Sequence, residues 1–177
     1  AAPPAPARPA ARPATAPDVG AAVEVLRAAE RPLIVAGGGA KHAAAALKRL
    51  QERTGAASFT TYAGRGVFPP GTPLHYGSFL ARPGSADEIA KADVVLAIGT
   101  ELSQVDLWRD HLGHRGTMIR VDIDPEVLSD MSRAEIAMAG DAAAITEALC
   151  DRLDPPLKSA WTQSEVDAAR DRWRREV

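Results

Sequence analysis

The sequence predicts an α/β fold, a doubly wound, Rossmann-like parallel sheet with helices on both faces. Two observations support this fold class. Short runs that are almost continuously apolar recur along the chain, and segments with apolar residues at helical spacing alternate with them. Strands that are apolar on both faces belong to parallel sheets covered by helices on both sides, and right-handed crossovers then wind the sheet in two directions.

Strands and helices follow from these runs and from the residues that bound them. The predicted strands are residues 33–36, 57–60, 94–98, 118–122 and 136–139. Helices are predicted between these strands. The first is expected to start at Asp18 as its N-cap, and the second to end just before Gly55. A later helix is expected to start at Asp141 and to end before Pro155. Residues 62–84 are predicted to be a loop, whose length is unusual unless it is functional or packs against another domain.

Two S/T-x-x-E patterns predict helix starts, SADE at residues 85–88 and TQSE at residues 162–165. The second pattern opens a terminal helix with four acidic and four basic residues between 165 and 177, which indicates a solvated face. Trp161 and Trp173 in this region are candidates for docking on another domain.

Bulk properties exclude several classes of protein. The net charge of −2 favours neither nucleic acid nor an anionic membrane, and no apolar run approaches the ~20 residues of a membrane span. The single cysteine, Cys150, excludes an internal disulfide and fits a cytoplasmic location, and His111 and His114 lack the partners of a metal site.

Residues 1–17, with eight Ala and six Pro, are expected to be a linker, and the missing initiator Met indicates a piece of something larger.

The stretch RPLIVAGGGA raises the question of nucleotide binding, because Gly37, Gly38 and Gly39 follow a predicted strand. A dinucleotide fingerprint needs a third glycine where this chain has His42, so NAD is disfavoured. A tight turn from strand to helix explains the glycines without a ligand, although the amides at such a helix start are able to hold an anion.

Polar residues follow two other predicted strands. Thr100 and Glu101 come after residues 94–98, and Asp122 and Asp124 end the next strand. The carboxyl edge of a parallel sheet is where α/β proteins place ligands. A carboxylate there accepts a hydrogen bond from ribose or adenine, or it merely caps the following helix, and the sequence leaves both readings open.

Five stretches occur in collinear order over residues 18–155: RPLIVAGGGA, TYAGRGVFPPGTPLHYG, DVVLAIGTELS, IRVDIDPEVL and AMAGDAAAITEAL. Together they resemble the central domain of thiamine-diphosphate-dependent 2-oxo acid decarboxylases and carboligases, the acetolactate synthase-like family. The 62–84 loop and GTELSQVDLW are most similar to decarboxylases of 2-oxo acids with a guanidino side chain. The resemblance implies a pyrimidine-binding domain before residues 1–17 and a diphosphate-binding domain after a helical connector at 156–177.

The resemblance implies a non-catalytic central domain, structural and with an optional nucleotide site, in a cytoplasmic homodimeric or homotetrameric lyase or transferase. Thiamine diphosphate and magnesium would be held by the flanking domains, since the activating glutamate and the G-D-G motif belong there. Gly140-Asp141 is followed by Ala142 and is not that motif, so this segment alone is predicted to be inactive.

Some members of this family hold FAD or ADP at positions that match Gly37–Gly39, Thr100–Glu101 and Asp122–Asp124. Flavin-binding members carry Arg-Phe where this chain has Glu101-Leu102, and a carboxylate there repels a pyrophosphate. FAD and ADP are therefore disfavoured. Two alternatives stay open: a free-standing adenine-nucleotide-binding regulatory module, and a purely structural oligomerisation domain.

Overall fold

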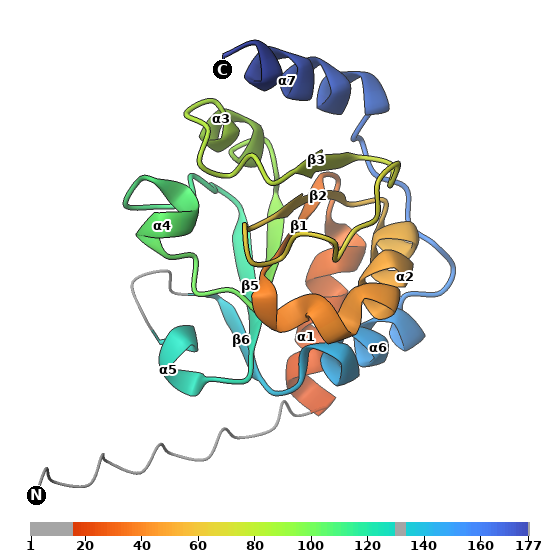
Figure 1. Cartoon of the computed structure of the whole chain (residues 1–177). Helices are drawn as coiled ribbons and strands as arrows, with labels where there is room; N and C mark the ends of the chain where they lie inside the picture. Colours follow the sequence, from red (N-terminus) through yellow and green to blue (C-terminus); the bar gives the residue numbers. More distant parts are fainter. Residues whose placement is uncertain (1–15, 130–133, 177) are drawn as a thin grey trace, which may run out of the picture.

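Six parallel strands form one sheet in the order β3-β2-β1-β4-β5-β6 (Figure 1). The computed structural model describes residues 16–129 and 134–176, so most of the expected linker lies outside the described residues. The strands are β1 (Pro32–Ala36), β2 (Ala57–Thr60), β3 (His75–Gly77), β4 (Val94–Ile98), β5 (Thr117–Asp122) and β6 (Ile136–Ala139). Every neighbouring pair is parallel, which confirms the predicted fold class.

The chain starts in the middle of the sheet and winds outward twice. It runs from β1 through β2 to β3, then returns to the free side of β1 with β4 and continues to β6. The direction of winding therefore reverses between β1 and β4. In doubly wound sheets this reversal, the topological switch point, leaves a crevice at the carboxyl ends of the two strands.

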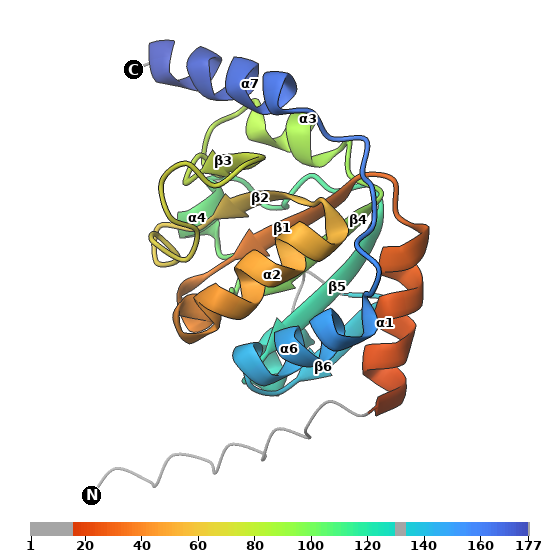
Figure 2. The same cartoon turned by 90° about the vertical axis from the view of Figure 1, so that its right-hand side faces the viewer.

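Helices cover both faces of the sheet (Figure 2). One face carries α1 (Ala16–Ala28), α2 (Ala44–Thr54) and α6 (Ala142–Arg152), and the short 3₁₀ helix η1 (Gly38–Ala43) leads into α2. The other face carries α3 (Ser85–Ile89) and α7 (Gln163–Arg175). Two one-turn helices, α4 (Gln104–Leu107) and α5 (Pro125–Leu128), follow β4 and β5. None of the helices among the described residues is long and apolar enough to cross a membrane.

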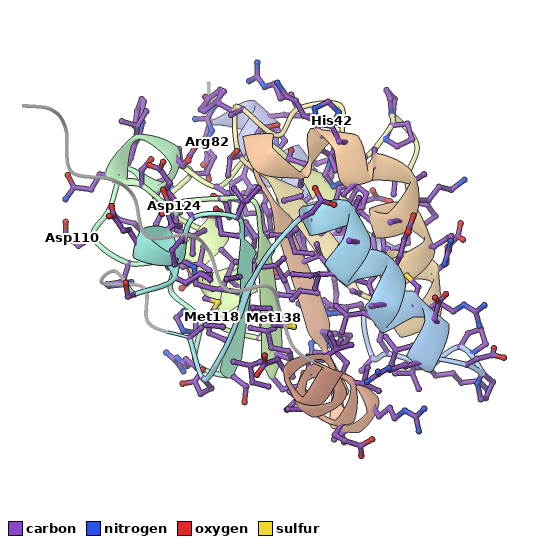
Figure 3. All side chains as sticks on the ribbon, turned by 90° about the horizontal axis from the view of Figure 1, so that it is seen from below. His42, Arg82, Asp110, Met118, Asp124 and Met138 are labelled. Carbon is purple, nitrogen blue, oxygen red and sulfur yellow. The ribbon has the colours of Figure 1, made fainter. Side chains whose placement is uncertain are left out.

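Each strand supplies side chains alternately to two hydrophobic cores. On β4, Leu96 packs in the core under α1, α2 and α6, whereas Val95 packs in the core under α3 and α7. Likewise, Met138 packs in the first of these cores and Met118 in the second, so the two side chains lie on opposite sides of the sheet (Figure 3). Because both faces are buried, the strands read as continuous apolar runs, which is why they were predictable.

Two predicted helix ends, at Gly55 and Asp141, are confirmed, and the predicted start of the first helix is wrong. Gly55 adopts a left-handed conformation, with φ of 64°, and ends α2, and the Asp141 side chain accepts a hydrogen bond from the Ala144 amide at the start of α6. The first helix begins at Ala16, so the prediction that Asp18 caps it is wrong. Asp18 instead lies in the first turn, where a carboxylate stabilises the exposed amides of the helix.

Strand β3 was not predicted, because its three residues lie inside the segment 62–84 that was expected to be a loop. Its central residue, Tyr76, is fully buried and stacks on Phe59 of β2 with the ring centroids 4.5 Å apart. The Tyr76 hydroxyl donates to Glu88 at 3.2 Å. A strand this short is held by such side-chain contacts between distant residues, and they leave no periodic pattern in the sequence.

The capping box predicted at residues 85–88 is wrong. The Ser85 hydroxyl donates instead to the Leu80 carbonyl at 2.6 Å, so it does not cap α3. The buried Glu88 carboxylate accepts from Lys91 at 2.6 Å and from Arg172 of α7 at 3.3 Å. Both side chains that match the motif therefore have other partners, and one of these contacts, between Glu88 and Arg172, joins segments far apart in the chain.

The terminal helix α7 packs on this domain. Its predicted capping box, Thr162 with Glu165, is confirmed. Trp161 and Trp173 are buried, and the Trp161 indole N–H donates to the Pro32 carbonyl at 2.7 Å. The expectation that these tryptophans dock on another domain is therefore wrong, since their apolar surface is already removed from water here. That residues 156–177 connect to a further domain stays a prediction.

His75 of β3 is held as a neutral ring. Its Nδ1 lies 2.9 Å from the Ser58 hydroxyl oxygen. The pKa of His75 is lowered from 6.5 to about 4, mainly by burial and also by the Arg170 cation, while the hydrogen bond to Ser58 acts in the opposite direction. The unfolded chain, in which this ring is solvated, therefore binds a proton at a higher pH than the folded chain does.

We predict that protonation of His75 destabilises the fold in mild acid. Between pH 6.5 and 4 the unfolded state binds one more proton at this ring, so the contribution of His75 to the free energy of unfolding falls as the pH falls through this window, by about 3 kcal/mol in total. Urea unfolding at pH 7.5 and pH 5 measures it. His75→Gln, which cannot titrate, should show a smaller loss over this interval, and an equal loss in both proteins would contradict the assignment.

Candidate functional site

A cavity of about 290 Å³ opens at the carboxyl edge of the sheet, between the ends of β1 and β4. This is the topological switch point, the place where doubly wound domains put their ligands. The cavity is lined by Gly38, Gly39, Thr61, Ala63, Gly99, Thr100, Glu101 and Asp106. Four of these residues were predicted as site residues, so the structure brings the glycine turn and the Thr100–Glu101 loop together.

Glycines are required here because two backbone turns touch. A β-carbon on Gly37 would lie 2.2 Å from the Gly99 carbonyl oxygen, and one on Gly39 would lie 3.1 Å from the Gly99 α-carbon. The contact is fixed by two hydrogen bonds, from the Gly37 amide to the Ile98 carbonyl at 2.9 Å and from the Gly39 amide to the Gly99 carbonyl at 3.0 Å. Gly99 itself has φ of 59°, in the left-handed region that favours glycine.

This geometry weakens the turn as a phosphate cradle. A phosphate-binding loop points unpaired backbone amides at the anion. Here the amides of Gly37 and Gly39 donate to backbone carbonyls of the β4 turn, and Gly38 is covered by the Ala63 side chain, which a β-carbon on Gly38 would approach to 3.0 Å. The glycines thus serve the close packing of two strand ends.

Thr100 and Glu101 have different roles in the cavity wall. Thr100 is buried, its hydroxyl accepts from the Leu102 amide at 3.1 Å, and its carbonyl accepts from the buried Arg120 guanidinium at 3.1 Å. Glu101 is exposed and lines the cavity together with Asp106. Two carboxylates at the mouth of the cavity repel a phosphate or pyrophosphate group that approaches it.

Asp122 and Asp124 do not line this cavity. The Asp122 carboxylate accepts from the Asp124 amide at 2.9 Å, and the Asp124 carboxylate accepts from the Glu126 amide at 3.0 Å as the N-cap of α5. In Figure 3, Asp124 lies beside α5, well away from His42 on η1. Of the two readings that the sequence left open, these contacts favour helix capping, with Pro125 in the first turn of α5.

Four residues of the cavity wall were not predicted as site residues: Thr61, Ala63, Gly99 and Asp106. The Thr61 amide donates to the Ala36 carbonyl at 3.0 Å, which brings the segment after β2 against the end of β1. The signal that would have found Thr61 and Ala63 is their position directly after the strand that pairs with β1. Asp106 follows Glu101 by five positions in the same loop and required the short helix α4 to place it.

The remaining titratable groups form no metal centre. Across residues 16–129 and 134–176, no cluster of three or more His, Cys, Asp or Glu side chains is arranged to hold a metal ion. Burial lowers the pKa of His114, against the opposing effect of Glu135, and burial raises the pKa of the Cys150 thiol. A thiol with a raised pKa is a weak nucleophile at neutral pH.

Fold and cavity together define a doubly wound α/β domain whose candidate site lies at the carboxyl edge, at the β1–β4 switch point. Residues 19–149 match the family model described as "Thiamine pyrophosphate enzyme, central domain". The chain belongs to this family, which confirms the resemblance seen in its sequence motifs.

Curated relatives are enzymes of the same family. The chain is 47% identical over 133 residues to a probable 2-ketoarginine decarboxylase of Pseudomonas aeruginosa, covering 75% of this chain and 24% of the relative. It is 29% identical over 145 residues to a pyruvate oxidase of Lactiplantibacillus plantarum, covering 81% of the chain and 24% of the relative. It is also 29% identical over 165 residues to an acetolactate synthase large subunit of Parasynechococcus marenigrum, covering 88% and 26%. The chain thus spans about a quarter of the length of these relatives.

We predict that Gly37→Ala destabilises the fold by about 3 kcal/mol, because its β-carbon meets backbone atoms that have no room to move. Gly20→Ala in α1 is the matched control: its β-carbon would lie 3.7 Å from the Arg152 guanidinium, an ordinary contact, and alanine in a helix should raise the free energy of unfolding by about 0.5–1 kcal/mol. Chemical denaturation measures both. Equal effects of the two changes would refute the close-approach explanation.

Proposed function

We propose that this chain is the non-catalytic central domain of a longer thiamine-diphosphate-dependent enzyme that decarboxylates a 2-oxo acid with a guanidino side chain. The observation that carries the proposal is the 47% identity to a probable 2-ketoarginine decarboxylase, against 29% to a pyruvate oxidase and to an acetolactate synthase large subunit. The 62–84 loop and GTELSQVDLW support the same substrate class from the sequence.

Thiamine diphosphate and magnesium do not fit the residues of this chain. The switch-point cavity carries the carboxylates of Glu101 and Asp106, which repel a diphosphate, and two amides of its glycine turn are bonded to backbone carbonyls. The described residues also lack a carboxylate cluster for magnesium. We therefore assign both cofactors to the pyrimidine-binding and diphosphate-binding domains of the longer, cytoplasmic enzyme, a homodimer or homotetramer.

The contribution of this chain is then a rigid scaffold. Its two cores fix the sheet, and the sheet fixes the loops at the carboxyl edge. Such a domain orients its neighbours in space, while the cofactor supplies the chemistry.

The direct test uses the longer polypeptide that carries this domain, supplied with thiamine diphosphate and magnesium. We expect carbon dioxide release from 2-ketoarginine with a kcat/KM at least about 100-fold above that for pyruvate, because a site built to pair a guanidinium rejects a substrate that lacks it. The 177-residue chain alone, the control, should release none. Acetolactate formation from pyruvate as the main reaction would assign the enzyme to the carboligases instead.

We further propose that the switch-point cavity holds no nucleotide, and a calorimetric titration of this chain with ADP and FAD tests it. We expect dissociation constants above about 1 mM, because the amides of Gly37 and Gly39 are already bonded and Glu101 faces an incoming phosphate. Saturable binding at micromolar concentration would favour the rival function, a free-standing adenine-nucleotide-binding regulatory module.

A further inference from the structure

Large apolar side chains are exposed at one edge of the molecule. Among the described residues, those with high exposure are Tyr62 (51%), Val105 (76%), Trp108 (76%) and Ile123 (68%). Tyr62 follows β2, Val105 and Trp108 belong to the α4 region after β4, and Ile123 follows β5. We call these four residues the carboxyl-edge patch, because all of them lie just past the carboxyl ends of strands.

The patch lies at the same edge of the sheet as the switch-point cavity. Strands β2, β1, β4 and β5 are consecutive in a parallel sheet, so the segments that follow them meet at the same edge. Thr61 and Ala63, on either side of Tyr62, line the cavity, and so does Asp106, the neighbour of Val105. The exposed apolar side chains and the cavity of about 290 Å³ therefore share this edge.

The structure holds Trp108 rigidly in this exposed position. Arg109, the next residue, anchors the loop: its guanidinium donates to the backbone carbonyls of Leu80, Leu107, His111 and Leu112 at distances of 2.7 to 3.2 Å. Trp108 has φ of 52°, and its amide donates to the Gln104 carbonyl at 2.7 Å. The left-handed backbone is unfavourable for a bulky residue, and the indole stays mostly exposed within this chain.

A rigid, exposed tryptophan beside a hollow is characteristic of a docking surface. Tryptophan is enriched among the residues that dominate binding energies, and patches of this kind on soluble domains mark interaction sites. The side of the patch around α4 and α5 is acidic, with Glu101, Asp106, Asp110 and Glu126. The Arg65 guanidinium lies over the Tyr62 ring, 4.5 Å from its centroid, at the other end.

We propose that the carboxyl-edge patch docks on another domain of the same longer polypeptide, whose surface has an apolar pocket for the Trp108 indole and basic side chains facing Glu101, Asp106 and Asp110. This inference rests on the proposed function in one respect, that the chain is a domain of a longer enzyme. About three quarters of the length of each relative lies outside the matched region, so such polypeptides carry ample partner surface. A domain in the same chain is present at millimolar effective concentration, so a patch of a few residues suffices.

A second copy of this chain fits the patch less well. A two-fold symmetric contact places the same surface on both sides, so the acidic residues around α4 would face each other. Like charges across an interface cost several kcal/mol. Basic side chains on a different domain remove this repulsion, and the charge pattern therefore favours a partner of unlike sequence.

Hydrogen exchange on the longer polypeptide and on the 177-residue chain tests the proposal. We expect the amides of residues 101–112 to exchange more slowly in the longer polypeptide. Trp108→Asn, which tolerates the left-handed backbone, should restore faster exchange by about 30-fold, since a central aromatic anchor contributes about 2 kcal/mol and 1.4 kcal/mol corresponds to tenfold. The control Glu24→Ser, an exposed position on α1 across the sheet, should leave these rates unchanged.

Folding is checked on the short chain: because the Trp108 side chain is exposed and Asn tolerates the left-handed backbone, Trp108→Asn should not lower its thermal unfolding temperature. Equal exchange of residues 101–112 in the two molecules would overturn the proposal. So would light scattering that finds a dimer of the short chain which Trp108→Asn dissolves, since the occupant would then be a second copy. If the longer polypeptide does not decarboxylate 2-ketoarginine but its patch is still protected from exchange, the substrate assignment is rejected and the docking is supported.

Discussion

The turn that follows β1 touches the turn that follows β4, and the rest of the carboxyl edge depends on this contact. Gly37 approaches the Gly99 carbonyl so closely that no β-carbon fits, and Gly64 lies as close to the Ala36 carbonyl, 2.3 Å from where its β-carbon would be. Three strand ends therefore meet backbone to backbone. This contact sets where α2 begins, where the Thr100–Glu101 loop leaves the sheet, and how small the cavity between them is.

The sheet was predictable because a strand buried on both faces needs consecutive apolar residues, as in β4. What was missed depends on partners far away in the chain. Tyr76 holds β3 in place through Phe59 and Glu88, and neither contact leaves a local pattern. The same carboxylate explains the false capping box, because a motif of the form S-x-x-E does not reveal that its glutamate is buried against α7. The terminal tryptophans failed as docking candidates for the same reason.

The position of the candidate site could be predicted better than the full set of residues that line it. Parallel topology alone places the Gly37–Gly39 turn and the Thr100–Glu101 loop at one edge, and the structure brings them together. Spacing does not reveal which hydrogen-bond donors are already used, so the amide bonds of the glycine turn had to be seen in three dimensions. Asp122 and Asp124 show the opposite case, since their contacts are local and match the Asp-x-Asp-Pro pattern of a helix start.

The carboxyl edge that we propose to hold no nucleotide is also the edge that we propose to dock on another domain. Hydrogen bonds from Arg109 hold the α4 loop in one conformation. The Trp108 side chain that this loop presents stays mostly exposed within the chain. A side chain held exposed in one position has its use in association, because a preorganised surface loses less entropy when it binds. The carboxylates of Glu101 and Asp106 then have one physical role in both respects, because a field that repels pyrophosphate from the cavity attracts a basic protein surface to its rim.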